Sequence, residues 1–147
     1  YSLVMDTYSF GYSSSGFTDM PMNHKVFLAQ FDAIKKLASE GPCVMVGRCA
    51  DYALSEYKDC FSVFVHADTD WRINRLSQKH NKTAKEAKDM INKTDKSRSS
   101  YYNYYTNKKW GAASSYNLCV DSSKLGIDGA AKAIIQAIEI FDSIKNK

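Results

Sequence analysis

The sequence lacks any apolar run approaching the ~20 residues that a membrane-spanning helix needs. It also lacks a charged-then-apolar signal segment at its start. These two absences argue against a membrane partner, and we therefore expect a cytoplasmic protein. The chain is nevertheless 147 residues long and 44% hydrophobic, which is enough for one domain with a substantial core.

Paired cysteine motifs are also absent, because none of the four cysteines is spaced as a C-x-x-C metal or redox pair. Two lie within apolar strand-like runs and two lie just outside such runs: Cys43 and Cys119, then Cys49 and Cys60. We predict buried free thiols of a reducing compartment and no zinc site. The histidines are scattered along the chain, and we expect no metal ligand among His24, His66 and His80.

The net charge of +4 is distributed unevenly along the chain. Residues 71–110 contain eleven basic and three acidic side chains, a net charge of +8, which leaves −4 for the remainder. A cationic segment on an otherwise mildly acidic protein indicates a local polyanionic partner. Within this segment, one row of lysines at three-residue spacing is more typical of a solvated helix face: Lys79, Lys82, Lys85 and Lys88.

The stretch GPCVMVGRCADYAL, residues 41–54, contains the most informative pattern. A Gly-Pro pair ends a helix, and residues 43–47 form an apolar run without polar alternation, which predicts a strand buried on both faces. Arg48 follows where this strand would end. Because ligands of open α/β sheets bind beyond the carboxyl ends of the strands, Arg48 is a candidate for binding an anion. The alternative is an ion pair with a nearby carboxylate such as Asp51.

The remaining patterns alternate between helices and strands. Apolar runs predict two further buried strands, at 61–66 and 116–120. Capping signals and helical spacing predict helices over 23–39, about 51–56, from Asp68 or Thr69 through Leu76, from the Thr83–Glu86 capping box to about Lys93, and over 127–144. In the last helix we expect an inward face of Ile134, Ile135, Ile138, Phe141 and Ile144. This order predicts an α/β fold with a three-layer, doubly wound parallel sheet.

Residues 1–23 are polar and aromatic and show no periodicity, which predicts a flexible loop or lead-in before a single domain over 24–147. Within this lead-in, GYSSSGFT at 11–18 has the glycine spacing of a phosphate-binding loop. Phe17 occupies the position where that motif needs lysine, and no clean strand or helix flanks it. We therefore interpret the stretch as a flexible loop.

Four stretches together resemble the cytidylate-kinase-like family: GPCVMVGRCADYAL, VFVHADTDWRINRL, INKTDKSRSSYYNYYTNKKWG and YNLCVDSSKLGID. The resemblance covers roughly residues 24–145, and its most specific part is the combination of GRCAD, TDKSR and the YYNYYT and KWG run. It implies an α/β fold of the P-loop kinase type with a helical lid over about 71–111. It also implies Mg²⁺-dependent transfer of the γ-phosphoryl group of ATP to a nucleoside monophosphate such as CMP.

The same resemblance implies roles for individual residues. Arg48 would contact the acceptor nucleotide, and Arg72 and Arg75 would begin the lid and face the polyphosphate. The lid residues Asp95, Lys96 and Arg98 would close over the phosphates. The implied catalytic residues are Arg72, Arg75, Lys96 and Arg98, and the implied substrate-binding residues are Arg48, Cys49, Asp51 and Asp95. Cations suit this chemistry, because phosphoryl transfer depends mainly on positioning and on stabilising negative charge.

Two features depart from the family pattern. The glycine-rich phosphate loop of the family is not recognisable, so we expect it either to precede Tyr1 or to be lacking. Cys49 occupies the position directly after the arginine, where cytidylate kinases carry an aspartate that helps to read the cytosine amino group. Asp51 is the candidate substitute, and the acceptor is left open as CMP, another nucleotide or an unrelated small molecule.

Two other functions stay open at the level of sequence. A non-catalytic nucleotide-binding relative would account for Cys49 and for the unrecognised phosphate loop. A nucleic-acid-binding module would use the cations and aromatic side chains of the segment 71–110, although a pI of about 8.8 is not extreme for that role. The sequence contains no signal for an oligomeric state.

Overall fold

The computed structural model describes residues 21–145, which fall into two compact units that divide between Cys43 and Val44. The first unit contains α1, Met22–Glu40, which matches the helix predicted over 23–39. The rings of Phe27 and Phe31 lie 5.9 Å apart on this helix. The stretch 11–18 and most of the predicted lead-in lie outside the described residues.

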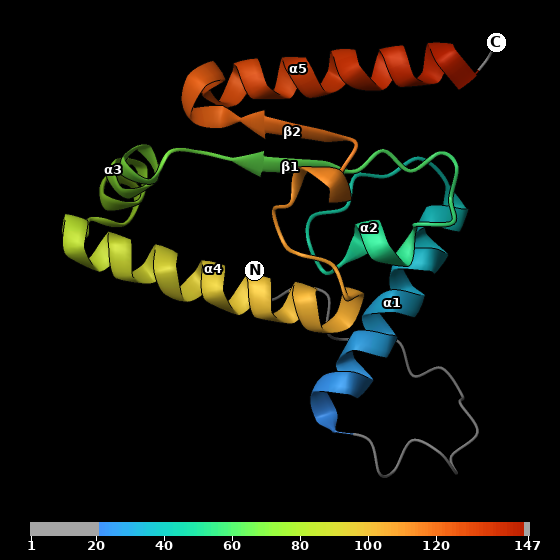
Figure 1. Cartoon of the computed structure of the whole chain (residues 1–147), viewed down its shortest axis with the longest axis horizontal. Helices are drawn as coiled ribbons and strands as arrows, with labels where there is room; N and C mark the ends of the chain where they lie inside the picture. Colours follow the sequence, from blue (N-terminus) through green and yellow to red (C-terminus); the bar gives the residue numbers. More distant parts are fainter. Residues whose placement is uncertain (1–20, 146–147) are drawn as a thin grey trace. The chain divides into compact units, whose positions relative to one another are not determined.

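The second unit is built on two parallel strands, β1 (Val63–His66) and β2 (Leu118–Asp121) (Figure 1). Their register pairs Val63 with Leu118 and His66 with Asp121, so both strands end at the same edge. The connection between them runs through α3 (Thr69–His80), α4 (Ala84–Thr106) and the 3-10 turn η1 (Ala113–Ser115). The short helix α2 (Ala50–Ala53) precedes the sheet, and α5 (Ser122–Lys145) follows it and packs along both strands. The described residues therefore form a mixed α/β unit with a parallel sheet.

Side-chain caps place the starts of α3 and α4 where the sequence predicts them. Asp68 caps α3 by accepting a hydrogen bond from the backbone N–H of Asp70 at 2.9 Å. Thr83 and Glu86 form the predicted capping box of α4, with the Glu86 carboxylate accepting from the Thr83 N–H at 2.8 Å. Both helices thus begin directly after the residue that caps them, and each begins where the sequence predicts it.

The helix α4 is longer than the sequence predicts. It continues past Lys93 to Thr106, where Asn107 in the left-handed conformation ends it. Its buried side chains recur at helical spacing along one face: Ala87, Ile91, Tyr102 and Thr106. Asp95 and Arg98 lie on that same face by spacing. The basic aromatic segment is therefore mostly one continuous helix.

The predicted buried strand over 43–47 is wrong for the described residues. No strand forms there, and Val44 and Val46 are 95% and 91% exposed. Cys43, predicted to be a buried thiol, is also exposed. A parallel strand exists only where a neighbour satisfies its backbone hydrogen bonds, and no described segment pairs with this run. The sheet of the described residues consequently has two strands.

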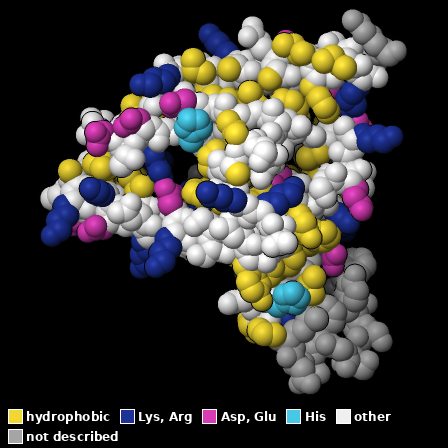
Figure 2. Space-filling view, viewed as in Figure 1, with side chains coloured by type: hydrophobic (Ala, Val, Ile, Leu, Met, Phe, Trp, Pro, Cys, Tyr) yellow, Lys and Arg dark blue, Asp and Glu magenta, His cyan; other side chains and the backbone are white. Residues whose placement is uncertain are grey.

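The inward face predicted for the last helix is also partly wrong. Ile134 and Phe141 are half-buried, but Ile135, Ile138 and Ile144 are exposed. A helix of 24 residues is ~36 Å long, whereas strands of four residues span only ~13 Å, so the sheet covers a fraction of it. Hydrophobic side chains accordingly appear along α5 in Figure 2. No helix within residues 21–145 has the length and apolar character to cross a bilayer.

Candidate anion-binding site

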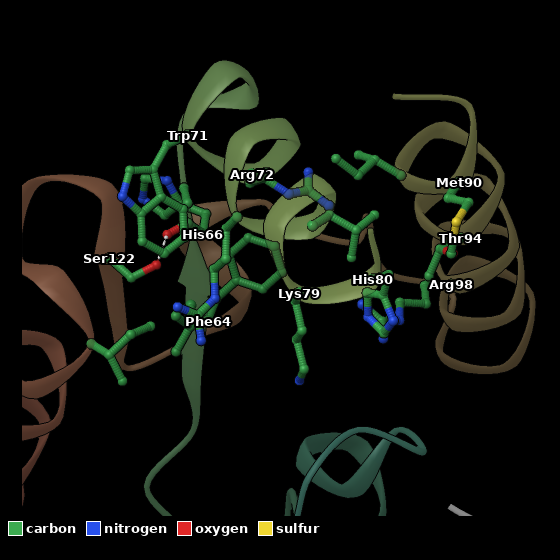
Figure 3. A pocket seen from close by; sticks show the side chains of 16 residues that line it. Phe64, His66, Trp71, Arg72, Lys79, His80, Met90, Thr94, Arg98 and Ser122 are labelled. Carbon is green, nitrogen blue, oxygen red and sulfur yellow. Dashed lines mark hydrogen bonds between the residues drawn. The ribbon is translucent and has the colours of Figure 1, made fainter. Parts of the chain in front are cut away.

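An open pocket of about 480 Å³ lies at the carboxyl ends of β1 and β2 (Figure 3). Its lining comes from the end of β1, one face of α3, the inner face of α4 and the start of α5. The polar and charged lining residues are His66, Arg72, Arg75, Lys79, His80, Thr94, Arg98 and Ser122. None of the described residues that line the pocket is an aspartate or a glutamate. The site combines an apolar floor with a cationic wall.

The cationic wall comes mainly from α3. Arg72, Arg75 and Lys79 follow one another at spacings of three and four residues, so they share a helix face. The Arg75 guanidinium lies 5.5 Å from the ring centre of Trp71, which also lines the pocket. This cation–π contact limits where the guanidinium can lie. In Figure 2, Lys and Arg side chains gather over α3 and α4.

Arg72 differs from the other cations because Asp95 of α4 neutralises it. Its Nη1 and Nη2 atoms donate to the two carboxylate oxygens at 2.7 and 2.9 Å. The hydrogen bonds to Asp95 raise the pKa of Arg72, burial opposes the shift, and the charge of Asp95 adds to it. Such a two-point contact fixes the orientation of both planar groups. It joins α3 to α4 on one side of the pocket.

Three cations of the pocket lack such a partner. Arg75, Lys79 and Arg98 have no carboxylate within ion-pair distance in the described part of the chain. All three are exposed, and cations gathered in one concave pocket attract anions more strongly than isolated surface charges do. The arrangement can therefore hold a ligand with more than one negative charge, and it excludes cationic ligands by repulsion.

The structure separates the residues that the sequence proposes as catalytic. Arg72, Arg75 and Arg98 line the same pocket. Lys96 is exposed and is not among the lining residues. Residues two apart on a helix point about 200° apart, so Lys96 and Arg98 of α4 face different sides. Asp95, proposed to bind substrate, is engaged with Arg72.

The other candidate substrate-binding residues lie around α2 and outside the pocket lining. Asp51 accepts a hydrogen bond from the Tyr102 hydroxyl at 2.6 Å, which fills one position on its carboxylate. Cys49 is 4% exposed, and burial, together with the charge of Asp51, raises its pKa to about 11. The prediction of a buried thiol is therefore confirmed for Cys49. Arg48 is exposed, with its backbone in the left-handed region.

Several residues of the site escaped prediction from the sequence. Phe64, His66 and Ser122 line the pocket because β1 and β2 end beside it. Tyr102 lies outside the pocket lining, and its contact with Asp51 is not predicted, because the sequence indicates a helix that ends at about Lys93. Tyr102 comes four residues after Arg98, so a helix that continues past Lys93 puts the two side chains on the same face.

The described residues contain no group of His, Cys, Asp and Glu side chains that could hold a metal ion. A Mg²⁺ ion bound mainly by nucleotide phosphates does not need such a group.

The fold and the site together define a mixed α/β protein with a cationic pocket at the carboxyl ends of two parallel strands. The chain belongs to the cytidylate kinase-like family, whose model matches residues 1–124. A crystal structure of an uncharacterized protein from Eubacterium ventriosum is similar to it, with a TM-score of 0.76 and 32% sequence identity. That similarity covers 80% of this chain and 74% of the other. The comparison with curated proteins found no match.

Proposed function

We propose that the pocket binds the phosphate groups of a nucleotide, and that the protein transfers the γ-phosphoryl group of ATP to CMP or a related nucleotide. The observation that carries the proposal is the set of three unneutralised cations, Arg75, Lys79 and Arg98, in one pocket at the ends of β1 and β2. Membership of the cytidylate kinase-like family supports the choice of nucleotide. The proposal includes a three-layer, P-loop kinase type of sheet to which β1 and β2 would belong.

The proposed reaction moves one phosphoryl group. A phosphate oxygen of the acceptor attacks the γ-phosphorus, the bond from the γ-phosphorus to the bridging oxygen breaks, and ADP leaves with that oxygen. Negative charge spreads over the equatorial oxygens during this step, and positioned cations stabilise it. Mg²⁺ enters only as part of the Mg–ATP substrate.

The residues of this chain would have different roles in the reaction. Arg75 and Arg98 would bind the transferring phosphates, because guanidinium groups match phosphate oxygens in two-point contacts. Arg72, held by Asp95, would keep α3 and α4 together around them. Lys96 would join only if α4 moved, since it faces away from the pocket lining. Arg48 would contact the acceptor nucleotide, with Cys49 and Asp51 beside it.

The test mixes the full chain with ATP, Mg²⁺ and each nucleoside monophosphate in turn, and measures ADP formation. Turnover with CMP or another acceptor is the expected result. A CMP kinase serves as the positive control for the assay. The proposal fails if no acceptor raises ATP consumption above background while the control enzyme is active.

A non-catalytic nucleotide-binding protein is the second candidate. Two features motivate it: the buried Cys49 stands where cytidylate kinases carry an aspartate, and the phosphate loop of the family is not recognisable in the sequence. Thermal stabilisation by nucleotides without turnover would indicate this function.

Oligonucleotide binding that weakens steeply with salt would instead indicate a nucleic-acid-binding module.

A further inference from the structure

The turn that presents Arg48 has an unusual backbone. Gly47, Arg48 and Cys49 have successive φ values of 72°, 58° and 56°. Positive φ is unfavourable for residues other than glycine, so two such residues in a row persist only where the surroundings hold them. We therefore looked for the contacts that hold this turn on its carboxyl side, where Cys49 is buried.

The helix α2 directly follows the turn and is fixed by a long-range hydrogen bond. The Tyr102 hydroxyl of α4 donates to Asp51 at 2.6 Å, and the two residues are 51 positions apart in sequence. Tyr102 is buried, and its ring stacks on that of Tyr116 with centroids 6.3 Å apart. Cys49, the last residue of the turn, is buried as well. A short, charge-assisted bond from a buried tyrosine is a strong tie.

The Tyr102–Asp51 hydrogen bond lies one turn of α4 away from the pocket. Arg98 lines the pocket, and Tyr102 binds Asp51 four residues later. Between them, the pKa of Tyr101 is raised, mainly by burial and then by Cys49 and Tyr105, while Arg48 acts in the opposite direction. Arg48 comes three residues before Asp51, so the Tyr102–Asp51 hydrogen bond also keeps the backbone of Arg48 within about 11 Å of the Asp51 backbone at this part of α4.

We propose that Tyr102 is a positioning residue whose hydrogen bond to Asp51 keeps Arg48 beside α4. Without that bond, α2 is no longer linked to α4 by a side-chain hydrogen bond. The turn at residues 47–49 can then leave the left-handed conformation. Arg48 then samples positions away from the helix that carries Arg98. The consequence for nucleotide binding rests on the proposed function, whereas the conformational role of Tyr102 does not.

The first test measures the conformation of the turn without any ligand. Tyr102→Phe removes only the hydroxyl, and Tyr104→Phe is the matched control because Tyr104 is 77% exposed on the same helix. Iodoacetamide labelling, followed by peptide mass spectrometry, reports the exposure of Cys49. We expect labelling of Cys49 to be about tenfold faster in Tyr102→Phe, from the loss of one charge-assisted hydrogen bond.

The labelling of Cys119 in β2 separates this effect from general unfolding. It should stay unchanged in Tyr102→Phe, because phenylalanine keeps the ring that stacks on Tyr116, and the pairing of β1 with β2 does not involve Asp51. Equal labelling of Cys49 in the tyrosine variant and its control would overturn the proposal, as would parallel acceleration at Cys49 and Cys119. If Tyr102→Phe does not fold, Asp51→Ala provides the same comparison.

The second test uses CMP as the probe, titrated by calorimetry in the presence of an ATP analogue that cannot react. Arg48→Ala and Tyr102→Phe should each weaken CMP binding, and the double variant should bind no more weakly than Arg48→Ala alone. Full additivity of the two losses would contradict an action through Arg48. If the unmodified chain binds neither CMP nor any other nucleoside monophosphate, the proposed function fails, and the labelling experiment still decides the role of Tyr102.

Discussion

Arg72 of α3 and Asp95 of α4 face each other with two parallel hydrogen bonds of 2.7 and 2.9 Å. Both side chains are partly buried, so water competes with this pair less than with a fully exposed one. The pair has two consequences for the pocket. It holds the two helices of the cationic segment together, and it leaves the remaining cations, Arg75, Lys79 and Arg98, to interact with a ligand.

Replacing Asp95 should loosen the contact between α3 and α4. We expect Asp95→Asn to lower the free energy of unfolding by about 1 kcal/mol, because an amide cannot accept both guanidinium bonds. Urea unfolding at neutral pH and moderate salt measures the change. Asp89→Asn, at an exposed position of the same helix, should change stability by less than about 0.5 kcal/mol. Equal effects of the two substitutions would contradict a specific role for the pair.

Two glycines have similar positive φ values, but a side chain would meet a close neighbour at only one of them. Gly111 and Gly126 have φ values of 75° and 70°, so alanine is strained at both. A Cβ at position 111 would lie 3.1 Å from the Phe64 ring, whereas nothing lies within 4 Å at position 126. We expect Gly111→Ala to lower the melting temperature more than Gly126→Ala, with an additional cost of about 1 kcal/mol for displacing the ring. Calorimetry of both variants tests the order.

The reactivity of the cysteines should differ with pH. Burial raises the pKa of Cys49 to about 11, so at pH 8 only about 0.1% of this thiol is ionised. The thiolate forms only as the pH approaches the raised value. Cys43 is exposed, and we expect iodoacetamide to modify it at least about a hundredfold faster than Cys49 at pH 8. Comparable rates, measured by peptide mass spectrometry, would show that the thiol of Cys49 is accessible and ionised.

The start of α4 should become less stable in acid. The hydrogen bonds with Thr83 lower the pKa of Glu86, with the backbone bond as the largest cause. A carboxylate whose pKa is lower in the folded state stabilises the fold above its unfolded pKa of ~4.3, and the stabilisation is lost as the pH falls through the lowered value.

The Glu86→Gln substitution should therefore destabilise the protein at pH 7 and have a shrinking effect below ~pH 4. Thr83→Ala should cost about 1 kcal/mol at pH 7, from the loss of the cap itself. Urea unfolding across this range measures both. A Glu86→Gln effect that does not vary with pH would contradict the linkage to the ionised capping box.

Local signals in the sequence predicted much of the fold. The caps at Asp68 and Thr83 and the apolar runs of β1 and β2 depend on neighbouring residues only, and the structure confirms them. The stretch 43–47 shows where such reasoning fails. An apolar run indicates a preference for burial, but a strand also needs a partner strand, and a local sequence pattern does not specify one.

The site was predictable to the extent that helical spacing placed its residues. Spacing alone brought Arg72 and Arg75 onto one face of α3, and both line the pocket. The pairing of Arg72 with Asp95 and of Tyr102 with Asp51 depends on how α4 packs in three dimensions. Polar residues such as Ser97 and Ser99 made the centre of α4 resemble a helix end, because serine has only moderate helix propensity.

The central claim is that the pocket between α3, α4 and the strand ends binds nucleotide phosphates through its unneutralised cations. Calorimetric titration of ATP into the full chain and into Arg98→Ala tests it most directly, with Lys93→Ala as a control at an exposed position of α4. We expect binding that is about tenfold weaker in Arg98→Ala, from the loss of one charge-assisted phosphate contact, and unchanged in Lys93→Ala. Equal affinity of Arg98→Ala and the unmodified chain, or no binding by the unmodified chain, would contradict it.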